Sequence, residues 1–372
     1  MIPVTRPFLP PLDELIPYLE RIWDSRILSN CGPLHIELEK RLAALLGVEH
    51  VSMFANATMA LMVAQRVLKI KGEVITTPYT FVATANSIIW ANNVPKFVDV
   101  DPESLTLDPV AVEAAIGEKT AAVMPVHCYG STADTKAFDE LSARYGIKII
   151  YDACHSFGVD DEGGSVLRHG DISVVSLHAT KIFNTFEGGI LITSSESIKT
   201  QVDLLKNFGF VDEITVSEIG LNAKMSEINA AVGLAQIPYF SKIIAERREI
   251  DKLYRTLLKT VPGVEIFEPA RQTRHNYAYF PIFIGDEHVW GRDQLVKELV
   301  NRGVYARKYF YPLVPEFDSF RNIDGTTPRK SFPRAEQAAN RVICLPIYPG
   351  LPLAKVHEIC QVVAGIDLAR IG

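Results

Sequence analysis

A series of short, uniformly apolar runs rich in β-branched residues divides the first half of this sequence. Between most of these runs lie segments whose apolar residues recur at helical spacing, such as 57–68 and 135–145. Strands this short and apolar are buried on both faces, and helical crossovers between them imply a mostly parallel sheet. The pattern predicts an α/β fold with a large three-layer α/β/α domain. The predicted strands are 48–54, 74–77, 96–100, 121–126, 147–151, 172–177 and 190–193.

A chain of 372 residues is too long to fold around one small hydrophobic core, so a second domain is expected. A proline-rich arm over 1–12 precedes the first helices, and a long helical stretch, 225–261, is interrupted by Pro238. We predict a large domain over 1–240, including the arm, and a small C-terminal α/β domain over 241–372. The other predicted elements are helices 13–25, 34–46, 292–302 and 353–364, and strands 278–284, 304–306 and 342–345.

Charge and composition exclude several classes of partner. The net charge of −6 offers no basic face for nucleic acid or a membrane surface, and no apolar run is long enough to span a bilayer. The nine histidines form no HxxxH or HxH pair, so we expect no metal site. The N-terminus does not resemble a signal peptide, and the five cysteines are scattered without CxxC spacing. Reduced thiols in a cytoplasmic protein are therefore expected.

In open parallel sheets, ligands bind beyond the carboxyl ends of the strands. After strand 48–54, small residues open a helix at Ala57 and Thr58. Free amides at such a helix start bind phosphate, although an ordinary N-cap is the commoner meaning. After strand 74–77, Phe81 offers a flat face to a planar ring or simply belongs to the core.

Three ionisable residues follow the next strand ends. Asp152 ends strand 147–151 and needs a partner, either a salt bridge, a helix cap or a protonated heterocyclic nitrogen. His155 lies a turn further on and is either functional or a satisfied core histidine. Lys181 follows strand 172–177, where burial would lower its pKa and make its amine a nucleophile; the alternative is a surface lysine in a turn.

Taken together, these strand ends supply an anion cradle, a ring face, a counter-charge for a pyridine nitrogen and an amine. Ser176 and His178 share one strand face beside this amine, because the side-chain period of a strand is two. Pyridoxal 5′-phosphate requires this combination of groups, so we predict a site for that cofactor.

The motifs at these positions resemble those of the DegT/StrS-type nucleotide-sugar aminotransferases. These are fold-type-I pyridoxal phosphate enzymes of the aspartate aminotransferase superfamily, and the likeness extends over nearly the whole chain. The most specific motif is SLHATK, which ends at Lys181 and continues as NTFEGG. The other two are DACH, which begins at Asp152, and GLNAKMSE, which contains Asn222.

The resemblance implies a role for each matching residue. Lys181 matches the lysine that bonds to the cofactor and moves the substrate proton, and Asp152 matches the partner of the pyridine nitrogen. Phe81 matches the aromatic stacked on the ring, and His155 the residue near its 3-hydroxyl. The implied phosphate contacts are Ala57, Thr58, Ser176 and Asn222.

Asn222 matches a residue that reaches the phosphate from a second subunit, so the resemblance implies a homodimer with shared sites. It also implies contacts with a nucleotide-sugar substrate. These substrate contacts are Phe8, His178, Glu187, Arg307, Tyr309 and Tyr311.

The implied reaction is a ping-pong transamination in which L-glutamate loads the cofactor and a keto-sugar nucleotide then takes the amine. The pattern around Lys181 resembles members that aminate carbon 4 of dTDP-4-keto-6-deoxyglucose for O-antigen and other glycan synthesis. Alternatives are a 3-aminotransferase and a non-catalytic cofactor-binding regulator. A sugar 3-dehydratase, which has histidine in place of the lysine, conflicts with Lys181.

Overall fold

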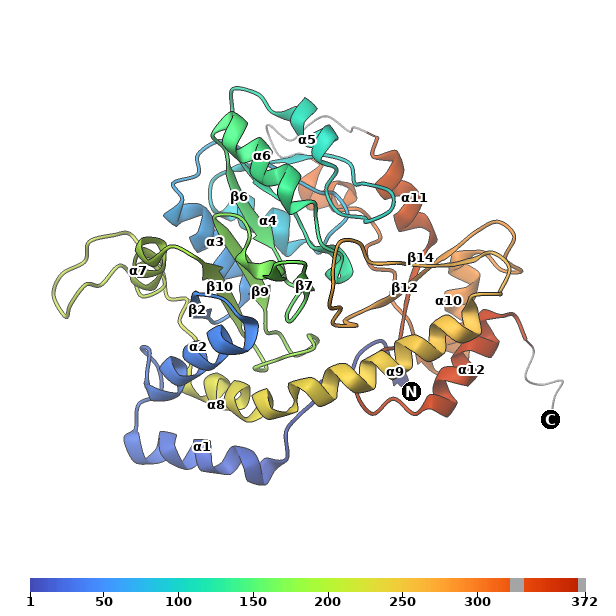
Figure 1. The fold of residues 1–372 in the computed structure, drawn as a ribbon, viewed down its shortest axis with the longest axis horizontal. Coiled ribbons are helices and arrows are strands. Elements are labelled where there is room, and N and C mark those ends of the chain that lie inside the picture. Colours follow the sequence, from blue (N-terminus) through green and yellow to red (C-terminus); the bar gives the residue numbers. More distant parts are fainter. Residues whose placement is uncertain (322–330, 367–372) are drawn as a thin grey trace.

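The computed structural model describes residues 1–321 and 331–366 of the chain. Its largest element is a seven-stranded sheet with strand order β2-β10-β9-β6-β5-β3-β4 (Figure 1). Neighbouring strands are parallel except at β10, which is antiparallel to both β2 and β9. The strands are β2 His50–Phe54, β3 Glu73–Thr76, β4 Val94–Phe97, β5 Thr120–Met124, β6 Lys148–Asp152, β9 Ile172–Ser176 and β10 Gly189–Thr193. The predicted α/β class and mostly parallel sheet are confirmed.

Helices cover both faces of this sheet because its strands are apolar on both. Within β2, Met53 packs with α2 and α8, whereas its neighbour Phe54 packs with α3 and α7 on the opposite face. Two further helices, α5 and α6, pack against β3, β5 and β6 on the same face of the sheet as α2 and α8. The bounds are α2 Pro33–Leu46, α3 Ala57–Val67, α4 Ala83–Trp90, α5 Pro109–Ala115, α6 Thr135–Tyr145, α7 Glu196–Leu205 and α8 Glu227–Gln236.

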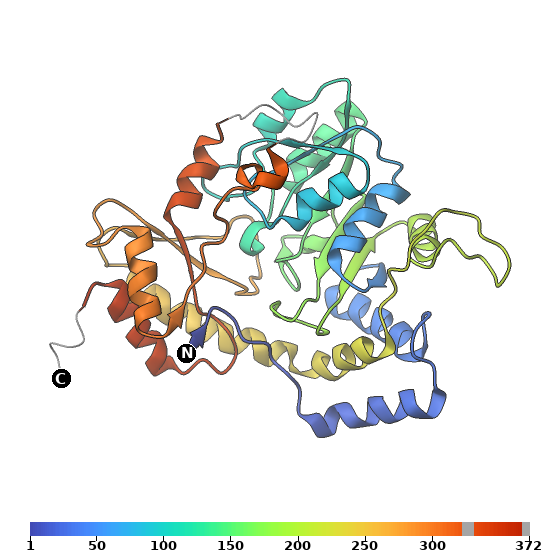
Figure 2. The ribbon, with the colours of Figure 1, turned by 180° about the vertical axis from the view of Figure 1, so that it is seen from behind.

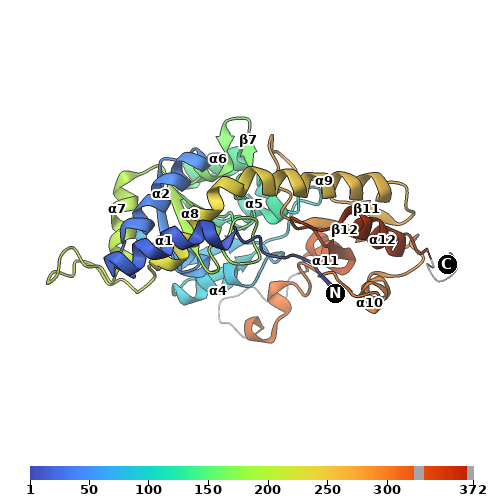
Figure 3. The ribbon, with the colours of Figure 1, turned by 90° about the horizontal axis from the view of Figure 1, so that it is seen from below.

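A long helical segment connects the large sheet to a second α/β body. After α8, Pro238 lies in the 3₁₀ turn η3 (Ile237–Tyr239), and α9 (Phe240–Leu258) continues beyond it. Figure 3 shows α9 continuing from α8 toward the second body, and α1 (Leu12–Ser25) lying beside α8. The predicted interruption at Pro238 is therefore a single 3₁₀ turn between the α-helices α8 and α9.

The second body is built on the antiparallel sheet β11-β12-β14. Its core packs against α9, α10 and α12. The bounds are β11 Val264–Ile266, β12 Phe280–Ile284, β13 Val304–Tyr305, β14 Val342–Leu345, α10 Arg292–Asn301, α11 Pro333–Arg341 and α12 Leu353–Val363. Residues 322–330 and 367–372 of the predicted small domain lie outside the described residues.

The N-terminal arm, which we assigned to the large domain, contacts the second body. Its strand β1 (Ile2–Pro3) pairs in parallel with β13. The segment 206–226 between α7 and α8 contains an exposed loop, 210–219, that extends away from the rest of the molecule (Figure 2). In the described part of the chain, none of the helices has both the length and the apolar character required to cross a membrane.

Candidate active site

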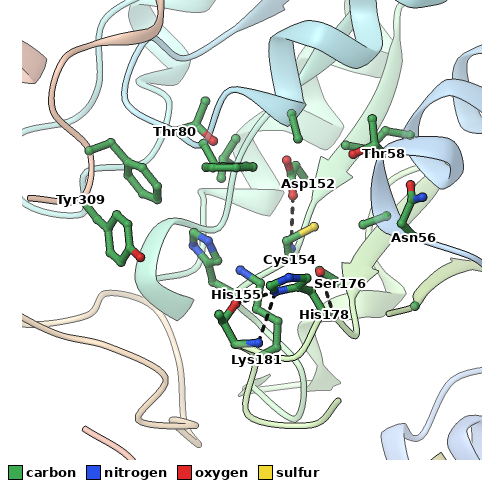
Figure 4. A pocket seen from close by; sticks show the side chains of 18 of the residues that line it. Asn56, Thr58, Thr80, Asp152, Cys154, His155, Ser176, His178, Lys181 and Tyr309 are labelled. Carbon is green, nitrogen blue, oxygen red and sulfur yellow. Dashed lines mark hydrogen bonds between the residues drawn. The ribbon is translucent and has the colours of Figure 1, made fainter. Parts of the chain in front are cut away.

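A cavity of about 320 Å³ opens beyond the carboxyl ends of the large sheet's parallel strands. Residues following β2, β3, β5, β6 and β9 border it, together with residues from the second body. Figure 4 shows side chains from these strand ends pointing into one space. Of the predicted site residues, the cavity brings together Ala57, Thr58, Phe81, Asp152, His155, Ser176, His178, Lys181, Glu187 and Tyr309.

The start of α3 forms the anion-binding side of this cavity. Asn56 is the N-cap, and its side chain accepts a hydrogen bond from the Met59 amide (2.9 Å). The amides of Ala57 and Thr58, in the first turn, have no partner within the helix and border the cavity. The cap is therefore Asn56 and not Thr58, which leaves this helix start available to an anion such as phosphate.

Asp152, the last residue of β6, is buried beside the cavity. One carboxylate oxygen accepts a hydrogen bond from the Thr84 hydroxyl (2.7 Å) and the other from the Cys154 amide (3.2 Å). The Thr80 hydroxyl is 2.9 Å from that of Thr84, so a short hydroxyl chain holds the carboxylate in place. Within the described residues Asp152 forms no ion pair, which leaves this buried charge available to a cationic group in the cavity.

Lys181 lies in the turn after β9, with Nζ 3.2 Å from the Tyr279 hydroxyl. Burial disfavours the charged amine, but Tyr279, Cys154 and Asp152 outweigh burial and raise the pKa of Lys181 above its ordinary value. Our expectation that burial would lower this pKa is therefore wrong for the free amine. Lys181 loses contact with water, but the oxygen and sulfur atoms around it favour the charged amine.

His155 is buried and borders the cavity as a neutral ring. Its Nδ1 accepts a hydrogen bond from the Tyr129 amide (3.1 Å), which places the ring proton on Nε2. The ring stacks on Phe310 with centroids 5.8 Å apart and meets the edge of Tyr279 at 4.7 Å. Burial, reinforced by Lys181 and His127, holds the pKa of His155 well below its ordinary value.

The pKa of His155 predicts a pH dependence of stability. The unfolded chain binds a proton at this histidine below about pH 6.5 while the folded chain does not, so the free energy of unfolding falls as the pH drops below that value. His155→Gln removes this titration but keeps an acceptor for the Tyr129 amide. We measure the free energy of unfolding of both proteins by denaturant titration from pH 4.5 to 7.5. Below pH 6.5, the value for the wild type should fall relative to the variant by up to about 1.4 kcal/mol for each unit of decreasing pH. If the two free energies of unfolding differ by the same amount at every pH, the lowered pKa of His155 is contradicted.

Four predicted site residues do not border this cavity. Phe8 accepts a hydrogen bond from Asn184 through its carbonyl (3.2 Å), and Arg307 pairs with Cys344 through its backbone. The Tyr311 ring lies under the guanidinium of Arg292 (4.3 Å). Asn222 is exposed on the extended segment 206–226, where its side chain accepts a hydrogen bond from Lys224 (2.8 Å). The role predicted for each of them stays a prediction.

The structure adds residues to the site that sequence reasoning missed. Tyr279, which contacts Lys181, comes from the segment leading into β12 of the second body. Thr84 lies in the first turn of α4, and Phe310 follows β13. No spacing in the sequence relates these three positions to the strand ends. Among the described residues, no group of His, Cys, Asp or Glu is arranged to hold a metal ion.

Solved structures with the same fold include aminotransferases. DesI, crystallised in the presence of its TDP-sugar product, has a TM-score of 0.92 and 33% identity, covering 98% of this chain and 92% of that one. A putative PLP-dependent aminotransferase from Bacillus cereus has a TM-score of 0.89 and 26% identity, covering 97% and 99%. The fold, together with a cavity containing Lys181 and Asp152, defines a pyridoxal-phosphate-dependent aminotransferase.

Sequence comparison gives the family. The profile of the DegT/DnrJ/EryC1/StrS aminotransferase family matches residues 12–364. A dTDP-4-amino-4,6-dideoxy-D-glucose transaminase from Shigella dysenteriae is 48% identical over 348 residues, which is 94% of each chain. This chain belongs to the DegT/DnrJ/EryC1/StrS aminotransferase family, and the family resemblance of the sequence motifs is confirmed.

Proposed function

We propose that this enzyme transfers the amino group of L-glutamate to carbon 4 of dTDP-4-keto-6-deoxyglucose, using pyridoxal 5′-phosphate. The product is a dTDP-4-amino-4,6-dideoxy sugar. One observation carries the proposal: a single cavity contains the lysine amine, a buried carboxylate without an ion pair among the described residues, and the start of α3. The Shigella transaminase supports the choice of sugar, because it matches this chain over nearly its full length.

The residues around the cavity fit the cofactor. Ala57 and Thr58 are suited to its phosphate because they offer free amides at the start of α3, and Ser176 adds a hydroxyl at the end of β9. Asp152 is suited to the pyridine nitrogen, and the Lys181 amine to the aldehyde. Phe81, which is 59% exposed at the mouth of the cavity, has a free ring face. When bound, pyridoxal phosphate supplies an electron-withdrawing ring that stabilises negative charge at the substrate carbon.

The chain's own groups carry out the proton chemistry. The Lys181 amine accepts and returns the proton of the carbon that carries the nitrogen, as a general base and then a general acid. The Tyr279 hydroxyl positions that amine by its hydrogen bond. The Asp152 carboxylate holds a proton on the ring nitrogen, because a buried negative charge favours a cation next to it. Because His155 Nδ1 accepts from the Tyr129 amide, its Nε2 proton is free to be donated to an oxygen of a molecule bound in the cavity.

At the rim of the cavity, polar side chains are suited to a sugar. The His178 ring nitrogen Nε2 is 3.7 Å from a Glu187 carboxylate oxygen, and both residues border the opening. Tyr309 adds a hydroxyl from the second body. We propose these three as sugar contacts, and Phe8, Arg307 and Tyr311 as contacts that require the bound nucleotide or a second chain.

A panel of keto-sugar nucleotides tests the substrate. The purified enzyme is incubated with L-glutamate and either a 4-keto or a 3-keto dTDP-hexose, and NMR then locates the new amine. We expect turnover of the 4-keto sugar with nitrogen at carbon 4. Turnover of 3-keto sugars alone would favour a 3-aminotransferase, and no turnover with any keto sugar would favour the non-catalytic regulator. Replacing glutamate with aspartate or glutamine identifies the donor.

We also propose a homodimer in which Asn222 of each chain completes the site of the other. Asn222 is exposed and does not border the cavity of its own chain. The segment 206–226 that carries it also exposes apolar side chains, which usually mark a protein interface. These apolar residues are Phe208, Phe210, Val211, Ile214, Val216 and Ile219.

Mixed variants test the shared site. Lys181→Ala removes the amine, and Asn222→Asp places a negative charge beside the cofactor phosphate, so each homodimer should be nearly inactive. Subunit exchange between them should restore roughly a quarter of the wild-type rate, because half of a random mixture is hybrid dimers with one intact site each. If the mixture is no more active than the two variants separately, Asn222 does not act across subunits.

Other predictions extend the proposal. We propose a cytoplasmic location, where the sugar nucleotide and cofactor are available, and a product used in glycan synthesis such as that of O-antigen. We place the domain boundary at residue 240, where η3 ends and α9 begins. Limited proteolysis of the purified protein tests this boundary.

A further inference from the structure

A second group of titratable side chains lies at the start of α2, and none of its members borders the active-site cavity. Cys31 precedes the helix, His35 lies in its first turn, and Glu39 follows one turn later. A spacing of four residues places His35 and Glu39 on the same side of α2. The three residues therefore follow one another as thiol, imidazole and carboxylate.

The imidazole of His35 connects the thiol with the carboxylate. Its Nε2 is 3.1 Å from a Glu39 carboxylate oxygen. The ring is 1% exposed, and its Nδ1 has no hydrogen-bond partner among the described residues. That nitrogen is the atom left to interact with the side chain of Cys31, which is partly exposed. The side chains of His35 and Cys31 interact, and a buried imidazole nitrogen without another partner is suited to take the proton of such a thiol.

Glu39 is fixed by several donors, so it orients His35 firmly. It accepts hydrogen bonds from the Met53 amide (2.9 Å) and from the ammonium groups of Lys199 (3.2 Å) and Lys206 (3.1 Å). Lys206 is itself paired with Asp203 at 2.8 Å. A base held by a third group in this way keeps one ring orientation, as in nucleophile-base-carboxylate sites generally.

The charges of this cluster favour a thiolate. The carboxylates of Glu39, Asp203 and Glu227, the last of which accepts a hydrogen bond from the His35 amide (2.8 Å), balance the ammonium groups of Lys199, Lys206 and Lys224. A protonated His35 then leaves one positive charge, which a thiolate at Cys31 neutralises.

The pKa values of the pair support this assignment. Burial opposes charge on His35, yet Cys31 and Glu39 raise its pKa to about 9. The interaction with His35 lowers the pKa of Cys31 despite its partial burial, and Lys206 contributes to the lowering. Burial instead raises the pKa of the other four thiols, Cys128, Cys154, Cys344 and Cys360.

We propose that Cys31 is a nucleophilic thiolate, activated by His35 and Glu39, and a modification site for small carbon electrophiles. In the reaction the sulfur forms a bond to the electrophilic carbon, and the leaving group departs with the electron pair of the broken bond. His35 keeps the proton that it took from the thiol, so the step involves no oxidation. The site lies outside the active-site cavity of its own chain, and its test does not depend on transaminase activity.

Alkylation of the holoenzyme by iodoacetamide between pH 5.5 and 9 tests the proposal, with peptide mass spectrometry reporting each cysteine. At pH 7 an ordinary thiol is only a few per cent thiolate, so Cys31 should react roughly tenfold faster than glutathione. Its rate should also exceed those of the other four cysteines and level off at a lower pH than that of glutathione. A rate that rises to pH 9 like that of glutathione, or no labelling of Cys31, would overturn the proposal.

His35→Gln supplies the matched variant, because it keeps a polar side chain facing Glu39 but cannot accept the thiol proton. It should slow labelling of Cys31 about tenfold at pH 7 and restore the pH profile of an ordinary thiol. Circular dichroism confirms folding, and Cys31→Ser identifies the labelled peptide. Unchanged labelling in a folded His35→Gln protein would refute activation by His35. If that variant does not fold, the wild-type profile decides alone.

Discussion

Lys181→Ala is expected to lower kcat for amino-group transfer by roughly 10²- to 10⁴-fold, the usual contribution of one acid–base group, or more if the covalent role is also lost. Lys181 is the one lysine among the described residues that border the active-site cavity. No second lysine amine there could replace it as the group that moves the substrate proton. Steady-state rates with glutamate and the keto sugar measure the loss, and the visible absorption of the bound cofactor should also change.

Lys148→Ala is the control for this experiment. Lys148 is an exposed lysine that pairs with Asp171 (2.8 Å) at the opposite end of β6 from Asp152. Exposed ion pairs contribute little to stability, so this variant should keep wild-type kcat. Full transamination by Lys181→Ala would show that another group performs the proton transfer.

Asp152→Asn is the second substitution with a large expected effect. The amide fills the same space but carries no negative charge, so nothing in its place would keep a proton on the ring nitrogen. We expect kcat to fall by roughly 10²- to 10³-fold, as when one preorganised electrostatic contact is removed from an active site. Steady-state kinetics measures this, and a pH titration of the cofactor's absorption reports the protonation of the ring.

Thr84→Val separates the charge of Asp152 from its orientation. This variant leaves the carboxylate but removes the hydroxyl that donates to it. A lost hydrogen bond to a charged group costs about 1.5–3 kcal/mol, so a smaller fall in kcat, roughly ten- to hundredfold, is expected. Wild-type activity in Asp152→Asn would mean that the ring nitrogen needs no counter-charge from this residue.

Much of the site could be predicted because a parallel sheet brings its strand ends to one edge. Once the apolar runs located the strands, Asp152, Ser176 and Lys181 had to lie at that edge with the helix start at Ala57. The strand bounds differ from the predicted ones by a few residues at most, since β-branched runs mark strand interiors better than their ends.

Sequence patterns could not reveal contacts between the two bodies. Tyr279 reaches Lys181 from a position 98 residues later, and the pairing of the arm with β13 joins residues still further apart. Helix α4 was also missed, because two of its buried positions are polar. The Thr84 hydroxyl donates to Asp152, and the Ser87 hydroxyl donates to the Thr84 carbonyl (2.7 Å), so the apolar stripe that marks a packed helix is incomplete.

Chemical trapping tests the central claim most directly. The holoenzyme is reduced with borohydride and digested, and mass spectrometry identifies the peptide that carries the cofactor. We predict a single adduct, on the Nζ atom of Lys181, which is absent after prior incubation with excess glutamate because the lysine has been released. An adduct on any other lysine, or none at all in a protein that contains bound pyridoxal phosphate, would contradict the account.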